Sequence, residues 1–455
     1  MLVDGAPRVA CVTPARRVAG RRVTTLDGLA PDVRQAWADA FCTTGASQCG
    51  FCTPGIIMRL SALADRSPAA VERSLLAHLC RCTGWRTIVD AAGLVGGPHV
   101  DRDFDKASRR AAIEGHVDQR VAPDVSLGAG GFADDTAPAD ALVAVPDGVG
   151  GWAVGETLTD ARAAAGKVQG RRTTAALRHP LEVPPGDWAL TLRTTWVEPA
   201  YLEPDASWCA PGGQPVTALA NGGAFGGKTT SAVGAVARQL ADEHGRTVRV
   251  LLSREDTVRL GPKRPPIAAG VRADGTGVLR VVRTPGIVDA VAAVAPGIEV
   301  KEVDVAGPPT SVALRAAGWA EAAVLQAALA GAARVTSPTG ATAEAEVVDG
   351  RVKVRVRCGE PLDDVVLRSY CIGAAHMGLG WVRSEGIAVD DEGVPRDLTI
   401  RSFGILRAVD MPAVDVTIEP DEGPPVNGSD AVFAAVAAAA WLADGLAPEW
   451  PTVTR

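Results

Sequence analysis

Two stretches, SQCGFCTPGIIM at residues 47–58 and LCRCTGW at residues 79–85, hold cysteines at close spacing. The cysteines in these stretches are Cys49, Cys52, Cys80 and Cys82. In a reducing compartment, close thiols indicate a metal centre or a redox group before they indicate a disulfide. Zinc sites usually leave about two to four residues between paired cysteines. The gap of one residue, Arg81, therefore favours a two-iron cluster over zinc, and over four unrelated core cysteines.

Composition describes an ordinary globular protein. The 455 residues are 47% hydrophobic and 22% charged, which is enough chain for about three domains of roughly 150 residues each. A net charge of -7 offers no basic surface to a phosphate backbone, so we expect no nucleic-acid partner. The N-terminus lacks a leader pattern, and the longest apolar run, residues 431–443, is shorter than the roughly 18 residues that cross a bilayer. We therefore expect a cytoplasmic protein without a membrane partner.

Residues 27–95 have the periodicity and the start signals of a four-helix bundle. The first predicted helix places Val33, Trp37 and Phe41 on one stripe and ends near Gly45. Three further helices are expected, from Thr53, from Ser67 and over Arg86–Leu94. The helix from Ser67 is predicted to bury Val71, Leu75 and Leu79. The cysteine pairs then lie in turns that precede helices, where backbone N–H groups stabilise negative charge.

These cysteine stretches resemble the helical [2Fe-2S] domain of the xanthine dehydrogenase and aldehyde oxidase family, the molybdenum hydroxylases. The resemblance covers nearly all of residues 1–95. It implies that the four cysteines hold a [2Fe-2S] cluster and that Gln48 lies close to a molybdopterin cofactor. It also implies that electrons cross from the pterin to the iron at this place.

Residues 1–26 resemble the closing strand of the ferredoxin-like domain that precedes the helical domain in this family. The rest of that domain is not visible in the sequence. We therefore expect a remnant strand whose missing neighbours either belong to a start site upstream or come from a ferredoxin-like partner. Cys11 and Cys42 have no partner at ligand spacing and are predicted to be small buried residues.

A charged connector, residues 96–125, is predicted to be a linker, and GGAFGGKT at residues 222–229 follows it in a strand-and-helix context. This segment formally matches a phosphate-binding loop. Together with the downstream KRPP, it resembles instead the glycine-rich pterin loop of the family's large subunit, and we favour this interpretation. The resemblance assigns cofactor binding to Gly222, Gly223, Phe225, Gly226 and Gly227.

Further blocks resemble the large subunit in the same order along the chain. They predict two molybdopterin-binding-like regions of α+β fold, residues 126–310 with a shortened hammerhead-like part and residues 311–455. The second loop, LRAAGW, would place Arg315 near the cofactor. Lys228 is expected to be a surface or structural lysine, and Glu203 a structural residue.

The family's catalytic glutamate has no counterpart here, because Ser429 stands at its position and Asp430 follows. Neither is a good base by default. We expect one of them to cap the alanine-rich helix Ala431–Leu442. His376, near Tyr370 and Cys371, is expected to be a satisfied core residue.

The resemblance thus implies an oxidoreductase that takes electrons from a small heterocycle or aldehyde at a molybdopterin site. The electrons would pass through the [2Fe-2S] cluster to an FAD-containing or other electron-acceptor subunit. The alternative is a non-catalytic iron-sulfur electron-transfer or scaffold paralogue without molybdenum chemistry.

Overall fold

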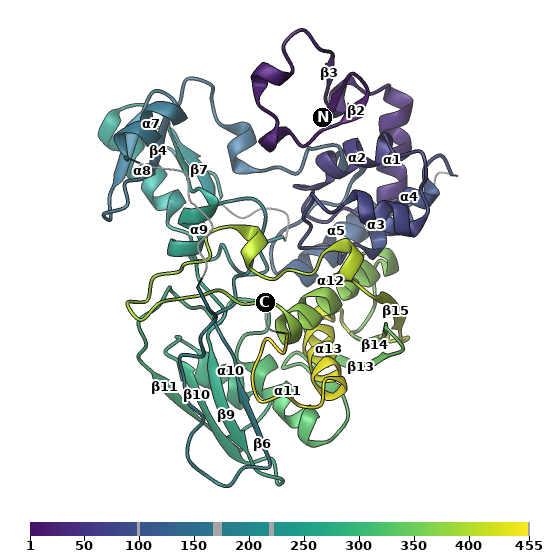
Figure 1. The fold of residues 1–455 in the computed structure, drawn as a ribbon, viewed down its shortest axis with the longest axis vertical. Coiled ribbons are helices and arrows are strands. Elements are labelled where there is room, and N and C mark those ends of the chain that lie inside the picture. The colour runs from purple at the N-terminus through teal and green to yellow at the C-terminus, as the bar shows by residue number, and fades with distance from the viewer. Residues whose placement is uncertain (98–100, 167–174, 218–222, 454–455) are drawn as a thin grey trace.

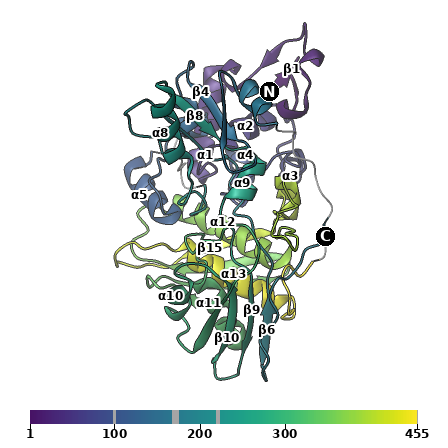
Figure 2. The ribbon, with the colours of Figure 1, turned by 90° about the vertical axis from the view of Figure 1, so that its left-hand side faces the viewer.

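The structure is a computed structural model that describes residues 1–97, 101–166, 175–217 and 223–453. The described residues form a mixed α+β fold with four small sheets, which confirms the predicted fold class at this level. The helices near the N-terminus lie at one end of the molecule, and a long sheet lies at the other (Figure 1). A view from the side shows α12 and α13 between these two ends (Figure 2).

The N-terminal strand has neighbours within the chain. The strands β1 (Leu2–Val3), β2 (Ala6–Pro7) and β3 (Val23–Thr24) pair antiparallel in the order β2-β1-β3. Val3 is 1% exposed, so this small sheet covers an apolar side chain. The prediction for Cys11 is wrong, because this residue lies exposed in the loop that follows β2, while Cys42 is half-buried.

Four helices follow in the predicted places: α1 (Pro31–Thr44), α2 (Thr53–Ser61), α3 (Pro68–Ser74) and α4 (Arg86–Leu94). Trp37 and Phe41 are buried, but Val33 of the same predicted stripe is 38% exposed. The helix α3 is shorter than expected and ends before Leu75, so Leu79 lies in the loop that carries the second cysteine pair.

The connector folds against the C-terminal part of the chain. Its helix α5 (Phe104–Gly115) begins at Asp103, whose carboxylate accepts the first backbone N–H groups, and packs on α12. A single turn, α6 (Pro123–Ser126), follows.

One four-stranded sheet lies beside the N-terminal helices in the order β5-β4-β8-β7. Its strands are β4 (Leu142–Pro146), β5 (Trp152–Gly155), β7 (Ala206–Cys209) and β8 (Val248–Leu251). Its helices are α7 (Leu158–Ala164), α8 (Val233–His244) and α9 (Arg254–Leu260). The α8 residues Val233, Ala237 and Leu240 recur at helical spacing and pack with Val248 and Val250 of β8.

A second sheet has the order β11-β10-β9-β6. Its strands are β6 (Leu190–Arg193), β9 (Ile267–Val271), β10 (Gly277–Val282) and β11 (Ile298–Val303), with α10 (Ile287–Ala292) between the parallel strands β10 and β11. The buried helix α11 (Trp319–Leu329) follows.

The long helices α12 (Asp364–Arg383) and α13 (Ser429–Ala443) pack on each other, and α13 lies against the last sheet. That sheet has the order β12-β13-β14-β15, with β12 (Arg334–Thr336), β13 (Thr342–Val348), β14 (Arg351–Arg357) and β15 (Ala413–Ile418). Apolar and charged residues alternate along β14, so Val352, Val354 and Val356 face the core. Nearly every side of α13 is alanine or another apolar residue, which is typical of a fully buried helix.

None of the helices in the described part of the chain is both long and apolar enough to cross a membrane.

Candidate iron-sulfur and cofactor site

The four predicted ligand cysteines lie together as two pairs of thiols. Cys49 and Cys82 have their Sγ atoms 3.5 Å apart, and Cys52 and Cys80 are joined by a second side-chain hydrogen bond. Within the described residues, no group of three or more His, Cys, Asp and Glu side chains is arranged to hold a single metal ion. Two pairs of thiols are the donor set of a cluster with two irons.

Each pair contains one thiol whose pKa is lowered by its partner. The hydrogen bond from Cys52 outweighs burial and lowers the pKa of Cys80 to about 6, with help from Thr83. The hydrogen bond from Cys82 lowers the pKa of Cys49, whereas donating those bonds raises the pKa of Cys52 and Cys82. Since the thiolate is the form that binds metal, each pair holds one group already prepared for it.

The loop that carries Cys80 and Cys82 is packed directly against α12. A Cβ on Gly373 would lie 1.8 Å from the carbonyl oxygen of Cys82, and a Cβ on Gly84 would lie 2.6 Å from the carbonyl oxygen of Ile372. Glycine at both positions therefore allows the two backbones to approach closely. This contact joins the cysteine loops to the C-terminal part of the chain.

Gln48 bridges the same two parts and keeps one polar atom free of any partner. Its Nε2 donates to Cys82 O at 3.1 Å and to Ser369 Oγ at 2.9 Å, but its buried Oε1 has no hydrogen-bond partner among the described residues. Gln119, whose Oε1 accepts from Tyr370, likewise has an unpartnered Nε2 in the same cavity of about 20 Å³. Buried polar atoms are rarely left unpaired, so these two mark a place for a small polar group. Gln119 had no sequence signal.

The glycine-rich segment reaches the cysteines. Gly222 lies outside the described residues, but a Cβ on Gly223 would lie 2.8 Å from the Cβ and 2.9 Å from the Sγ of Cys49. Gly226, with φ of +86°, leaves room for Ala313 O, from which a Cβ would lie only 1.8 Å away. The segment is thus held between the first cysteine loop and the loop that carries Arg315.

Lys228 is buried and paired with Glu203, and its ammonium group lies 5.3 Å from the centre of the Tyr201 ring. A phosphate-binding loop needs this lysine to reach a phosphate. Here the lysine has a structural partner, as expected. Burial raises the pKa of Glu203, and the charge of Lys228 opposes this effect.

Arg315 and Phe225, both predicted near the cofactor, are stacked at 4.3 Å. The Arg315 guanidinium donates from Nε to Asp430 Oδ1 at 3.0 Å and from Nη2 to Ser429 Oγ at 2.8 Å. Its Nη1 lies 3.1 Å from Met377 Sδ. All three ends of the guanidinium are therefore engaged by side chains of this chain.

The capping role expected for Ser429 or Asp430 is wrong. The residue before α13 is Gly428, and both Ser429 and Asp430 lie in the buried first turn of the helix. The Asp430 N–H donates to Asn427 Oδ1 at 2.9 Å, so Asn427 caps this turn in their place. The side chains of Ser429 and Asp430 serve Arg315 instead. Although burial raises it, the pKa of Asp430 is lowered on balance by the hydrogen bond with His116 and by the charge of Arg315.

The start of α13 receives a carboxylate that the sequence did not reveal. Glu114 of α5 accepts from the N–H groups of Gly428 at 3.1 Å and Ser429 at 2.8 Å, and it pairs with Arg110. Both side chains of this pair are fully buried. An i,i+4 charge pair in a connector is ordinarily a solvated feature, so the pattern alone does not indicate this role.

A second cavity, of about 30 Å³, lies beside Phe225 and Arg315. Arg81, from the second cysteine loop, lines it together with Glu198. Glu198 lies 2.9 Å from Lys263, but its carboxylate oxygens have no hydrogen-bond partner of good geometry. The cavity has room for one or two water molecules.

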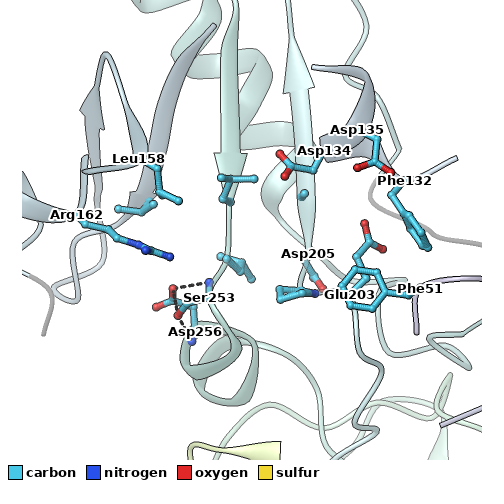
Figure 3. A pocket seen from close by; sticks show the side chains of 15 residues that line it. Phe51, Phe132, Asp134, Asp135, Leu158, Arg162, Glu203, Asp205, Ser253 and Asp256 are labelled. Atoms are coloured by element: carbon cyan, nitrogen blue, oxygen red, sulfur yellow. Dashed lines mark hydrogen bonds between the residues drawn. The ribbon is translucent and has the colours of Figure 1, made fainter. Parts of the chain in front are cut away.

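A larger pocket of about 220 Å³ opens next to the first cysteine loop (Figure 3). Phe51, between the two cysteines of that loop, lies edge-on to Phe132 with ring centres 5.3 Å apart. Opposite them, Leu158 and Arg162 line the far side of the pocket. The acidic residues of the lining are Asp134, Asp135, Glu203, Asp205 and Asp256. Most have partners, such as Tyr201 for Asp205 and Ser253 for Asp256.

His376 is fully buried and its Nε2 lies 3.0 Å from Leu406 O, as expected for a core histidine, but its buried Nδ1 has no hydrogen-bond partner among the described residues, so the ring is only partly satisfied. Burial, aided by the charge of Arg81, lowers its pKa to about 4, so the ring is neutral at pH 7. Tyr370 and Cys371 are buried on the same helix, and burial raises the pKa of both.

Comparison with known proteins agrees with the cysteine geometry. Residues 25–93 match the family described as "[2Fe-2S] binding domain". The chain is 38% identical over 96 residues to a probable subunit of the Bacillus subtilis xanthine dehydrogenase, covering 20% of this chain and 56% of that protein. It is 36% identical over 97 residues to the xanthine dehydrogenase iron-sulfur-binding subunit of Escherichia coli O157:H7, covering 20% of this chain and 61% of that one. The chain thus matches little more than half the length of these relatives.

The fold as a whole is similar to that of solved aldehyde oxidoreductases. The enzyme from Desulfovibrio desulfuricans superposes with a TM-score of 0.71 at 13% identity, over 99% of this chain and 94% of that chain. The enzyme from Desulfovibrio gigas gives a TM-score of 0.71 at 14% identity, over 100% and 94%. At such identities the likeness concerns the fold alone.

Fold and site together define an iron-sulfur protein in which a helical [2Fe-2S] binding domain is joined to an aldehyde-oxidoreductase-like α+β fold. Residues 25–93 are thus similar to iron-sulfur subunits named as xanthine dehydrogenase subunits, and the fold is similar to that of aldehyde oxidoreductases.

Proposed function

We propose that this chain is an oxidoreductase that passes electrons from a molybdopterin site through a [2Fe-2S] cluster held by Cys49, Cys52, Cys80 and Cys82. One observation carries the proposal: the Cys49–Cys82 thiol pair is in contact with the glycine-rich segment at Gly223. A redox cluster and a segment able to cradle an anionic cofactor are thereby neighbours. The four helices α1 to α4 would act as one bundle that holds the cluster.

The residues present fit a [2Fe-2S] cluster. The donor set is two pairs of thiols, and the pKa of one member of each pair, Cys49 and Cys80, is lowered by the hydrogen bond from the other member. Glycine at 223 keeps side-chain atoms away from Cys49 Sγ. The cluster would supply one-electron transfer at this place.

In the proposal, Gln48 contacts the molybdenum cofactor through a polar group small enough for the cavity of about 20 Å³ beside its Oε1. Its buried, unpartnered Oε1 is an acceptor for an N–H group, and its Nε2 holds the carbonyl of Cys82. Through Gln48, a bound pterin would be one side chain away from a cluster ligand. The cofactor, when bound, would supply the two-electron oxidation of the substrate.

The residues at the other end of the site do not offer a free base. Ser429 and Asp430 are both engaged by Arg315, and Glu114 is engaged by Arg110 and by the start of α13. We therefore derive no proton-transfer step at these residues. In the proposal, Arg315, Phe225 and the glycine-rich segment position the cofactor, and the substrate is a small heterocycle or an aldehyde.

The proposal includes a partner that accepts electrons, because a reduced cluster that cannot pass its electron on cannot accept another. An FAD-containing subunit suits this role, and a ferredoxin-like partner would complete the sheet formed by residues 1–26. The relatives named above include proteins that are subunits by name. In the proposal, residues 126–310 and 311–455 form the two molybdopterin-binding-like regions, joined to the cluster domain by residues 96–125.

The test is metal analysis of protein purified without oxygen from cells able to make the cofactor, with electron paramagnetic resonance after dithionite reduction. We expect two irons per chain, a signal of a reduced [2Fe-2S] cluster, and molybdenum close to one per chain. Iron without molybdenum would leave the electron-transfer or scaffold alternative. Zinc in place of iron would overturn the proposal.

A further inference from the structure

The arginine between the last two cysteines is held by one carboxylate from the far part of the chain. Arg81 donates from Nη1 and Nη2 to Glu385 Oε1 and Oε2, each at 2.6 Å, and the side chains are 3% and 2% exposed. Its Nε donates to Pro199 O at 3.0 Å. A two-point contact of this kind fixes the guanidinium in one orientation.

Local backbone shape brings Glu385 to this position. The residue follows the end of α12, and its N–H donates to Gly380 O at 2.7 Å. A Cβ on Gly380 would lie 2.2 Å from Glu385 Oε1, so only glycine leaves the carboxylate its place. The end of α12 is thus built to deliver one negative charge to the second cysteine loop.

Another buried Arg–Glu pair lies nearby, but it joins segments other than the cysteine loops. Arg264, which lines the 30 Å³ cavity together with Arg81, forms a similar two-point contact with Glu321 at 2.7 and 2.9 Å. Arg264 lies between α9 and β9, and Glu321 lies in α11. Arg81 differs because its neighbours in sequence are Cys80 and Cys82.

We propose that Glu385 is a positioning residue that sets the reduction potential of the cluster by cancelling the charge of Arg81. This rests on the proposed function, because it requires a [2Fe-2S] cluster at the four cysteines. Reduction adds one electron to the cluster, and in a buried environment a nearby net charge changes the energy of that electron. With Glu385 ionised, the charges of the pair largely cancel, so the potential is lower than Arg81 alone would make it.

The two partners therefore have opposite predicted effects. Glu385→Gln leaves the positive charge uncompensated and favours the reduced cluster, so the potential rises. Arg81→Gln leaves the negative charge of Glu385 uncompensated, so the reduction potential falls. We expect each shift to be at least tenfold in the reduction equilibrium, which is 59 mV for a one-electron couple. The double variant Arg81→Gln with Glu385→Gln removes both charges and returns the potential close to that of the wild type.

The experiment is a redox titration of the full-length protein at pH 7.5, in which electron paramagnetic resonance measures the fraction of reduced cluster. Glu321→Gln is the matched control, since it breaks a buried pair of the same geometry outside the cysteine loops and is expected to shift the potential less than Glu385→Gln. Opposite shifts in the single variants and recovery in the double variant support the inference. If one single variant loses its cluster, the direction of the potential shift in the other single variant and the potential of the double variant still test the inference.

Equal potentials in wild type and Glu385→Gln, or shifts of the same sign in both single variants, would overturn the inference while leaving the proposed function intact. Absence of a cluster signal in the wild-type protein would instead overturn the proposed function. The two failures are therefore distinct.

Discussion

His116 Nε2 lies 2.7 Å from Asp430 Oδ2, and this contact joins the end of α5 to the first turn of α13. Arg315 holds the other oxygen of Asp430 at 3.0 Å, and Asn427 contacts His116 at 3.2 Å. A half-exposed imidazole is therefore connected to the buried arginine beside Phe225. Glu114 of α5, whose carboxylate contacts the start of α13, adds negative charge close to His116.

This contact predicts a pH-dependent part of the stability. The hydrogen bond with Asp430 raises the pKa of His116 above its ordinary value of 6.5, although burial opposes it. A raised folded-state pKa contributes stability that is fully present below pH 6.5 and is lost as the pH rises through the folded value. The pKa of Asp430 is lowered in the folded protein, so its contribution to stability is fully present above pH 3.8. This contribution is lost as the pH falls through the folded-state pKa of Asp430.

The measurement is urea unfolding of wild type and His116→Gln at pH 6 and pH 8.5. We expect the wild type to exceed the variant by roughly 0.5 to 1 kcal/mol more at pH 6 than at pH 8.5, after allowing for solvent screening at the half-exposed ring. His244→Gln, at the exposed end of α8, is the control for replacing a histidine outside this contact. A difference that grows with pH would contradict the assignment.

The cysteine pairs predict which thiols hold iron. Replacing Cys80 by serine removes the thiol with the lowered pKa, and we expect loss of the cluster absorption and of most iron. Cys42→Ser is the matched control, since burial raises the pKa of that half-buried thiol to about 11 and it lies outside the pairs. Iron retained by Cys80→Ser and lost from Cys42→Ser would show that the ligand set is wrong.

The sequence predicted what depends on short spacing. Cysteine spacing, helix start signals and glycine positions are local, and they located α1, α2 and α4 and gathered the thiols in two turns. Contacts between distant segments carry no local signal. The helix start at Ser429 looked like a capping site, yet its partners come from two other places in the chain, Arg315 from the loop before α11 and Glu114 and His116 from the end of α5.

The same reason explains the other errors. The helix α3 ends at Ser74 although apolar spacing continues to Leu79, because the second cysteine loop must begin soon afterwards. Cys11 looked like a core residue on composition, but it lies in an exposed loop. Gln119 and Glu385 lie in connecting segments, where polar residues are ordinary and only the fold shows that these two are buried.

Gly223 predicts a steric limit at the cluster. A Cβ there would meet Cys49 at 2.8 to 2.9 Å, so Gly223→Ala must displace either the cysteine or the glycine-rich segment. We expect about 1 to 3 kcal/mol of destabilisation and faster loss of iron to a chelator. The control is Gly93→Ala in α4, where nothing lies within 4 Å and alanine is the better helix former. Iron release at the wild-type rate from Gly223→Ala would contradict the close contact.

The Lys228–Glu203 pair separates the cofactor interpretation from the nucleotide interpretation of the same loop. Lys228 and Glu203 are 1% and 10% exposed at their side chains. Lys228→Met leaves Glu203 as an unpaired buried charge, so we expect a loss of roughly 3 to 5 kcal/mol in unfolding free energy. Glu203→Gln with Lys228→Met removes both charges and should recover a large part of that loss.

A phosphate-binding lysine behaves differently in both measurements. It would give the wild type a measurable affinity for ATP by calorimetry, and Lys228→Met would abolish that affinity. We expect no ATP binding by the wild type, because the ammonium group is already paired within the protein. ATP binding that depends on Lys228, without the stability loss in Lys228→Met, would favour a nucleotide site. Recovery in the double variant, without ATP binding, would show that the lysine holds the glycine-rich segment in place beside the cysteines.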